Sequence, residues 1–190
     1  MKTFTTIVLA AAAATTGVMS AAIGSSPHAV VNPDSGASFK LADSVVNSAA
    51  LDRFQNAQIV HASVNLKARQ ILETDPDSNV TTPDNVFVLQ CTDPGFRGNC
   101  LVFGSPPGQC VSYFNFDSPN STDISDIFNN QVASLSTNTG GACQFYKHDG
   151  CDDKGDDPGL SSDYNYNLAV SLLEDPRTVE YDNAITSWRC

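Results

Sequence analysis

The sequence predicts an all-β domain of short antiparallel strands over residues 86–190. Three observations support this prediction. Short apolar runs separated by turn-forming residues recur through this part of the chain, which is typical of a β-sandwich. All six cysteines of the chain lie within it. A turn sequence, Asn129–Ser134, recurs near the C-terminus as Asp182–Ser187, and this repeat indicates an internal duplication.

The composition limits the classes of partner. The chain has 190 residues, of which 41% are hydrophobic, so it can form a core. Its formal net charge is −11. Binding to nucleic acid phosphates requires a surplus of Lys and Arg, and anionic membrane surfaces attract the same residues. We therefore expect neither nucleic acid nor membrane as a partner, whereas the charge favours cations.

Residues 1–22 are predicted to be a signal peptide. Lys2 gives the positive start, Ile7–Ala14 the short apolar stretch, and Ser20–Ala22 small residues for cleavage. The apolar stretch is too short to span a bilayer. The protein is therefore expected to be secreted and extracellular.

Residues 23–85 are predicted to be a helical or flexible segment before the β domain. Residues 23–40 are rich in Ser, Pro, Gly and Ala and are expected to be flexible. Between Leu41 and Glu73 apolar residues recur at helical spacing, which predicts one or two helices, and residues 74–85 form a linker. Removal as a pro-segment after Arg69 and retention as an extension both remain open.

The β domain is predicted from short strands in order along the chain. A helical turn is expected at Leu168–Glu174. The expected strands are Val86–Leu89, Cys100–Phe103, Cys110–Phe114, Val132–Ser136, Ala142–Lys147, Thr178–Tyr181 and Ala184–Cys190.

The cysteines are predicted to form disulfides. An even number in one region of an exported chain favours three disulfides, and the close pairs that zinc sites need are missing from the sequence. The sequence leaves the pairing open among Cys91, Cys100, Cys110, Cys143, Cys151 and Cys190. Sequons at Asn79 and Asn120 predict N-glycosylation in the same compartment.

Two hairpin sequences, each followed by one of the repeated turns, resemble the βγ-crystallin family. Asp93–Gly98 matches the hairpin of the family's first unit, and Tyr146–Gly150 begins that of the second. Together with the Cys-rich end, Ser-Trp-Arg-Cys, they look most like small secreted fungal members. The resemblance covers residues 86–190 and implies a sandwich of two Greek-key units. The sequence departs from the family pattern at Cys91 and Cys151, which replace aromatic residues, and in a long acidic insertion from Asp152 to about Asp175.

The resemblance also implies calcium sites shared between the two turns. One site would use the Thr186 hydroxyl, the Asn130 side chain and the Gln131 carbonyl. The reciprocal site would use Asn183 and the Ala184 carbonyl, but its hydroxyl position is Ala133, so we expect one competent and one defective site. With few charged ligands the affinity should be weak, with a Kd of about 10⁻⁵ to 10⁻³ M. In the alternative interpretation these turns only end strands through local hydrogen bonds.

The sequence gives little support for an enzyme. It lacks the common nucleophile, zinc-protease and phosphate-loop motifs. His148 is the only His after residue 85, and its place at a hairpin tip favours a surface turn. The acidic stretch Asp149–Asp157 does not have the spacing of an EF-hand loop, so we expect it to be a solvated loop.

We therefore expect a secreted, non-enzymatic βγ-crystallin-like protein that binds calcium weakly to stabilise its fold. The alternative is an interaction protein on the same scaffold, such as an antimicrobial toxin or a protease inhibitor. A third hypothesis is a component of the cell wall or matrix. The sequence names no protein or cell-wall target. Exposed apolar residues in the Ser105–Gly108 loop or in the insertion would favour the alternative.

Overall fold

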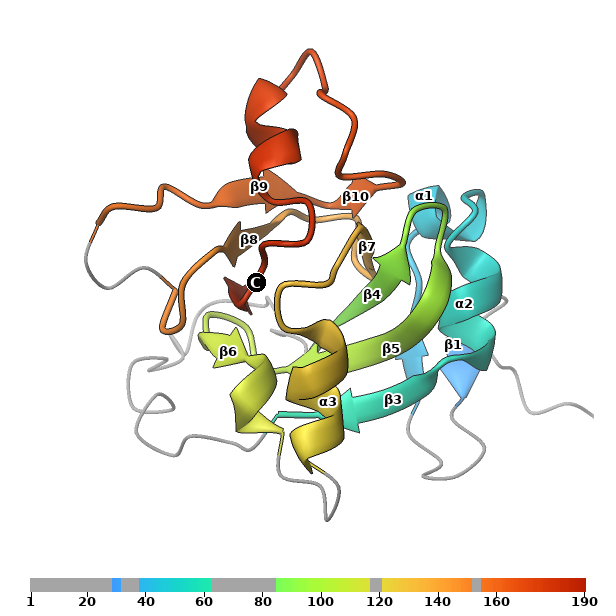
Figure 1. Ribbon diagram of the computed structural model, residues 1–190. Coiled ribbons are helices and arrows are strands. Elements are labelled where there is room, and N and C mark those ends of the chain that lie inside the picture. The colour runs from blue at the N-terminus through green and yellow to red at the C-terminus, as the bar shows by residue number, and fades with distance from the viewer. Residues whose placement is uncertain (1–28, 32–37, 63–84, 117–120, 152–154) are drawn as a thin grey trace, which may run out of the picture.

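The computed structural model describes residues 29–31, 38–62, 85–116, 121–151 and 155–190, and these are mostly β-strands in sheets, as predicted (Figure 1). A five-stranded sheet has the order β10 (Tyr164–Asn165), β7 (Ser134–Thr137), β4 (Val86–Asp93), β5 (Arg97–Ser105) and β3 (Gln58–His61). A four-stranded sheet has the order β6 (Val111–Ser112), β11 (Ser187–Arg189), β8 (Cys143–Tyr146) and β9 (Leu160–Ser162). A separate pair joins β1 (Ala29–Val31) to β2 (Ser38–Lys40). The described helices are α1 (Asp43–Val46), α2 (Leu51–Asn56) and α3 (Ser121–Phe128), with 3₁₀-helices η2 (Tyr113–Asn115) and η3 (Pro176–Glu180).

The two halves of the domain exchange one strand each. Strands β4 to β7 come from the first half and β8 to β11 from the second. Strand β10 of the second half pairs with β7, and β6 of the first half pairs with β11, all antiparallel. Each sheet therefore contains strands of both halves, so neither sheet is complete without a strand from the other half.

Strand β4 is buried on both faces, which explains its continuous apolar sequence. Val86 and Val88 face the core between the two sheets. Phe87 and Leu89 alternate with them and face a second core formed with Val30 and with residues 39–57. Successive side chains of a strand point to opposite faces, so a strand covered on both sides has no need of polar alternation.

The core between the sheets is centred on aromatic rings. The ring of Phe103 lies 5.0–5.6 Å from four others, those of Tyr113, Phe116, Phe128 and Trp188, in edge-to-face arrangements. All five residues are buried. Edge-to-face packing is favoured because the positive ring edge meets the negative ring face.

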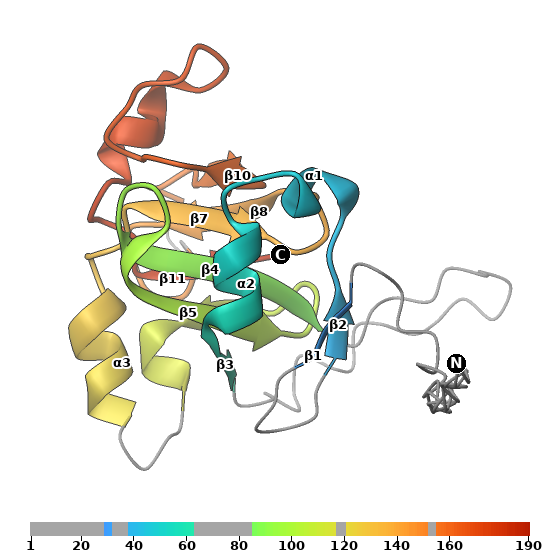
Figure 2. The same cartoon turned by 90° about the vertical axis from the view of Figure 1, so that its right-hand side faces the viewer.

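The segment before residue 86 covers the outer face of the five-stranded sheet, where Figure 2 shows α2 in front of β4 and β5. Phe54 of α2 is fully buried, and the ring of Phe39 stacks on that of Phe87 with centroids 4.2 Å apart. Arg53 Nε donates a 2.8 Å hydrogen bond to the carbonyl of Phe96. These contacts attach the segment to the sheet.

Two predictions for this segment are wrong. Residues 23–40 were expected to be flexible, yet Ala29–Val31 and Ser38–Lys40 are paired strands. Ile59 and Val60 were expected to continue a helix, yet they belong to β3, which pairs parallel with β5. Strand β5 would otherwise present an unpaired edge, and the β-branched side chains of β3 suit a strand. The sheet therefore begins before residue 86, the boundary expected from the sequence.

The second half also differs from expectation. Thr178–Tyr181 was predicted as a strand, but Pro176–Glu180 is the 3₁₀-helix η3, which begins with Pro176 after Asp175 caps it. Leu168–Glu174 contains no helix. The sequence missed the short strands β9 and β10, which lie in the acidic insertion. Proline at the first helical position and an Asp cap are typical helix starts.

Several predictions lie outside the described residues. These are the signal peptide 1–22, the cleavage site at Arg69, and the sequons at Asn79 and Asn120. Among the residues that the structure describes, no helix is both long enough and apolar enough to cross a membrane.

Candidate calcium site

The two repeated turns fold alike and lie against each other. The second residue of each turn, Asn130 and Asn183, has a positive φ of 57° and 53°, a conformation in which Asn is enriched. The Asn130 N–H donates to the Ile185 carbonyl, and the Asn183 N–H donates to the Val132 carbonyl, both at 3.0 Å. This reciprocal pair of hydrogen bonds relates the two halves by approximate two-fold symmetry.

The last serine of each turn holds the hairpin of its own half. Ser134 Oγ donates to the Asp93 carbonyl at 2.8 Å and accepts from the Phe96 N–H at 3.1 Å. Ser187 Oγ donates to the His148 carbonyl at 2.6 Å and accepts from the Cys151 N–H at 3.0 Å. Both serine hydroxyls therefore already donate and accept a hydrogen bond within the fold.

The structure brings the predicted ligands of one site together. Thr186 Oγ1 donates a 3.1 Å hydrogen bond to Asn130 Oδ1. Thr186 is buried, whereas Asn130 and Gln131 are exposed. A hydroxyl from one half and an amide oxygen from the other thus meet beside solvent, from which an ion could enter.

The reciprocal site differs by one hydroxyl. Ala133 and Thr186 have equivalent backbones, since the Ala133 N–H donates to the Cys91 carbonyl at 3.0 Å and the Thr186 N–H to the Tyr146 carbonyl at 2.8 Å. Ala133 offers only a methyl group where Thr186 offers an oxygen. Asn183 is exposed, and Ala184 is half-buried.

Sequence reasoning missed two further oxygens, those of the first residue in each turn. Asn129 Oδ1 and Asp182 Oδ1 are buried and have no hydrogen-bond partner among the described residues. Burial raises the pKa of Asp182, although a hydrogen bond from the Asn183 amide opposes this. A buried oxygen without a donor is costly unless another group satisfies it. The equivalent places of Asn129 and Asp182 in the repeat were the signal that could have marked them.

The donor set fits a hard cation. Amide, hydroxyl and carboxylate oxygens are the ligands that calcium takes. In the described part of the chain, no cluster of three or more His, Cys, Asp or Glu could hold a metal ion. Apart from the Asp182 carboxylate, the side-chain oxygens of these two turns belong to neutral amide and hydroxyl groups.

The six cysteines form three disulfides, as predicted: Cys91–Cys100, Cys110–Cys151 and Cys143–Cys190. The first joins directly opposed residues of β4 and β5. The second links the two halves of the domain. All six thiols are thereby oxidised, which leaves no thiolate nucleophile.

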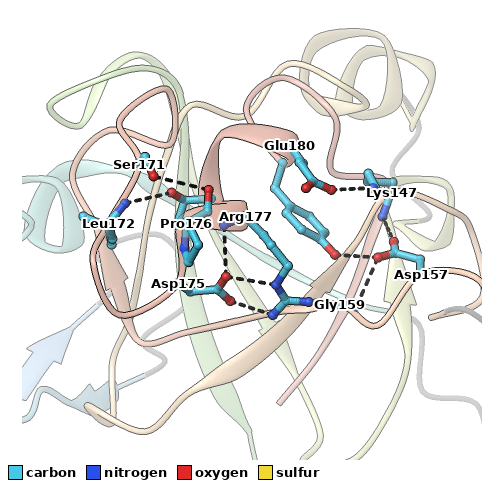
Figure 3. A network of polar contacts seen from close by, with 11 residues as sticks. Lys147, Asp157, Gly159, Ser171, Leu172, Asp175, Pro176, Arg177 and Glu180 are labelled. Atoms are coloured by element: carbon cyan, nitrogen blue, oxygen red, sulfur yellow. Dashed lines mark hydrogen bonds and ion pairs between the residues drawn. The ribbon is translucent and has the colours of Figure 1, made fainter.

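The acidic stretch Asp149–Asp157 was expected to be a solvated loop, but Asp157 at its end is not solvated. It is buried, and its carboxylate accepts hydrogen bonds from the Tyr181 hydroxyl and from the N–H groups of Lys147 and Gly159 (Figure 3). Burial acts to raise the pKa of Asp157, but these hydrogen bonds outweigh it, so the pKa lies below its usual value of 3.8. Burial, and after it the hydrogen bond to Asp157, raises the pKa of Tyr181. Asp157 therefore anchors the insertion.

A cleft of about 480 Å³ lies between the N-terminal segment and β10, lined in part by Asn47, Ser48 and Tyr164. Two of its polar side chains make hydrogen bonds within the fold. The Asn47 amide donates to the Asp43 carbonyl at 2.8 Å, and the Ser48 hydroxyl donates to the Val45 carbonyl at 2.8 Å. These two side chains are therefore already used by the N-terminal segment itself.

Comparison of the chain with protein-family models, with curated proteins and with solved structures gave no match. The grounds for assigning a function are therefore the motifs in the sequence and the geometry of the two turns.

Proposed function

We propose that the chain is an exported, non-enzymatic βγ-crystallin-like module of two Greek-key units that binds calcium weakly, and that the ion stabilises the fold. One observation carries the proposal: Thr186 Oγ1 and Asn130 Oδ1, from opposite halves, lie 3.1 Å apart. Oxygens from both turns must converge for a shared ion, and these two do.

The strand exchange supports the assignment of two units. Each half places three of its strands in one sheet and its fourth strand in the other sheet. The equivalent roles of Ser134 and Ser187 support a duplicated unit as well. An export compartment agrees with three disulfides, because such bonds persist in oxidising surroundings.

Calcium would act as a bridge between the halves. The Thr186 hydroxyl would turn its lone pair to the ion, and Asn130 Oδ1 and the Gln131 carbonyl would supply further oxygens. The buried Asn129 Oδ1 and Asp182 Oδ1 lie in the same turns and would gain a compensating charge nearby. An ion that binds only the folded state adds about 2.7 kcal/mol to stability at a concentration 100 times its Kd.

Calorimetric melting of the mature chain tests the proposal. We expect millimolar calcium to raise Tm relative to a chelated sample, by about 2–4 °C for each kcal/mol of stabilisation. Magnesium at equal concentration is the control, since it demands a tighter octahedral shell and should act less. An identical Tm with calcium and with chelator would end the calcium proposal.

The alternative, an interaction protein on the same scaffold, is favoured by a separate observation. In the insertion Leu173 is 99% exposed, and Val170 and Leu172 are also exposed. The Ser105–Gly108 loop has no exposed large apolar residue. Growth-inhibition and protease assays with the mature protein test this alternative, which is independent of calcium.

A further inference from the structure

The loop of residues 168–181, here called the apex loop, projects from the rest of the domain (Figures 1 and 2). It carries four exposed aliphatic side chains: Val170 at 51%, Leu172 at 38%, Leu173 at 99% and Val179 at 45% exposure. Single exposed apolar residues are ordinary, but a cluster of them on one projection indicates a contact surface.

An ion pair stiffens the C-terminal side of the apex. Arg177 Nη2 donates to Asp175 Oδ2 at 2.6 Å, and Arg177 Nε donates to Asp175 Oδ1 at 2.9 Å (Figure 3). The Arg177 N–H also donates to Asp175 Oδ1 at 3.0 Å. This forked geometry fixes the direction of both side chains immediately after Leu173 and Glu174.

Further hydrogen bonds tie the two sides of the apex together. The buried Thr178 Oγ1 donates to the Val170 carbonyl at 2.9 Å and accepts from the Leu172 N–H at 3.4 Å. Ser171 Oγ donates to the Pro176 carbonyl at 3.4 Å. Leu173 and Glu174 thus lie at the tip, between two sides of the loop that are joined by these hydrogen bonds.

The base of the apex loop is attached to the domain on both sides. Leu168 is fully buried, and its N–H donates to the Ala133 carbonyl at 2.9 Å. On the other side the Tyr181 hydroxyl donates to Asp157, and Lys147 Nζ pairs with Glu180 at 3.3 Å. The loop therefore presents Leu173 from a fixed position, and binding would cost it little conformational entropy.

We propose that the apex loop enters the active-site cleft of an endopeptidase in the manner of a substrate, with the Leu173 side chain in an apolar primary pocket, and thereby inhibits the enzyme. A convex loop fits a concave cleft, and a preorganised loop with one fully exposed anchor supplies a central hot spot. The hydrogen bonds across the apex would keep the Leu173–Glu174 segment in place in the cleft. This inference deepens the interaction alternative and does not depend on calcium.

The negative charge of the loop and of the whole chain favours a protease over a lipid surface or a second copy of this chain as the partner. Glu174 adjoins the anchor, and the chain has a net charge of −11. Both disfavour anionic lipid surfaces and a second copy of this acidic chain. An uncharged Leu would also suit an apolar pocket better than the acidic pocket of a protease that cleaves after Lys or Arg.

The test uses the full mature protein with chymotrypsin and subtilisin, which have apolar primary pockets, and with trypsin, which has an acidic one. We expect inhibition of at least one of the first two and little of trypsin. Leu173→Lys should weaken that inhibition by about 100-fold or more and create inhibition of trypsin. Val31→Ser, at another exposed apolar position, is the matched control and should inhibit like the parent.

Folding does not confound this test, because a side chain that is 99% exposed can change without loss of core contacts; equal Tm values for the parent and Leu173→Lys check this. Absence of inhibition of both apolar-pocket enzymes would overturn the inference, as would inhibition unchanged in Leu173→Lys. Rapid cleavage after Leu173 without inhibition would also overturn it. So would Leu173-dependent self-association in sedimentation, or Leu173-dependent binding to phosphatidylcholine vesicles. Growth inhibition that survives Leu173→Lys would leave the interaction function standing and reject this inference alone.

Discussion

Thr186 Oγ1 donates a 3.1 Å hydrogen bond to Asn130 Oδ1, although the two residues are 56 positions apart in the chain. The contact joins the two halves of the domain at the pair of turns. It places a hydroxyl and an amide oxygen where a shared cation would need them, and the first calcium prediction follows from it.

Thr186→Ala is expected to remove most of the calcium-induced rise in Tm, because it deletes the one hydroxyl among the expected ligands. Without calcium it should cost about 0.5–1.5 kcal/mol through the lost hydrogen bond. Thr186→Ser keeps the hydroxyl and serves as the matched control. A calcium titration of Thr186→Ala that matches the parent would show that Thr186 is not a ligand.

Ala133→Ser should strengthen calcium binding, because it supplies the oxygen that the reciprocal turn lacks. The backbones at Ala133 and Thr186 make equivalent hydrogen bonds, so the new hydroxyl would take the corresponding place. Isothermal calorimetry should show a second binding event or a lower Kd. Binding identical to that of the parent would contradict the reciprocal site.

Two of the three disulfides, Cys91–Cys100 and Cys110–Cys151, differ strongly in span and should contribute differently to stability. In the chain-entropy model, removal of Cys110–Cys151, with 41 residues of separation, costs about 4 kcal/mol, whereas the nine-residue span of Cys91–Cys100 gives about 2.5 kcal/mol. Paired Cys→Ala variants, unfolded in denaturant, measure both values. A larger loss for the Cys91–Cys100 pair would show that packing of the buried Cys91, rather than chain entropy, decides its contribution.

Asp157 predicts an acid-dependent loss of stability. Its hydrogen bonds with Tyr181, Lys147 and Gly159 lower its pKa below 3.8 in the folded protein. A lowered pKa stabilises the fold above pH 3.8, and this contribution disappears as the pH falls through the folded-state pKa. Asp157→Asn should therefore be less stable by about 1–3 kcal/mol at neutral pH and should lose less stability on acidification.

Denaturant unfolding of the parent and of Asp157→Asn from pH 7 to pH 2 provides the measurement, and Asp149→Asn, at an exposed position of the same acidic stretch, is the control. Parallel stability curves for the parent and Asp157→Asn would show that the ionisation of Asp157 is not coupled to folding.

The N-terminal segment should remain bound to the β domain after the chain is cut between residues 62 and 85. No cysteine precedes residue 85, so its attachment is through β3, the Phe39–Phe87 stack and the buried Phe54. A chain with an engineered protease site between residues 62 and 85 is expected to co-elute as two fragments after cleavage. Release of the N-terminal fragment under native conditions would contradict this prediction.

Phe54→Ala should destabilise the protein by about 3–5 kcal/mol, the usual cost of deleting a buried Phe ring. In the cleaved chain it should also release the N-terminal fragment. Gln55→Ala, at an exposed position on the same helix, is the control and should change little. Equal stability of the two variants would show that α2 does not hold the segment.

Local patterns predicted the elements whose sequence and surroundings agree. Val86–Leu89 and Cys100–Phe103 are apolar, β-branched or aromatic runs bounded by turns, and both are strands. The repeated turns were visible because their Asn residues adopt a left-handed backbone that few other residues tolerate. The calcium ligands came from a resemblance, and their binding stays a prediction.

Other elements depend on contacts that no local pattern contains. Gln58–His61 is too short for its periodicity to separate helix from strand, and it is a strand because the edge of β5 lies beside it. Pro176–Glu180 became a 3₁₀-helix because Asp175 caps it and Arg177 pairs with that same carboxylate.

The sequence by itself determined an all-β domain, the oxidation of its six cysteines and the duplication of its turn, since each depends on residue type and spacing along the chain. Only the tertiary structure decided which cysteines pair, which residues cover the second face of β4, and that Thr186 meets Asn130. Those relationships join positions distant in sequence, and their geometry is fixed by how the two sheets pack and exchange strands rather than by any local preference.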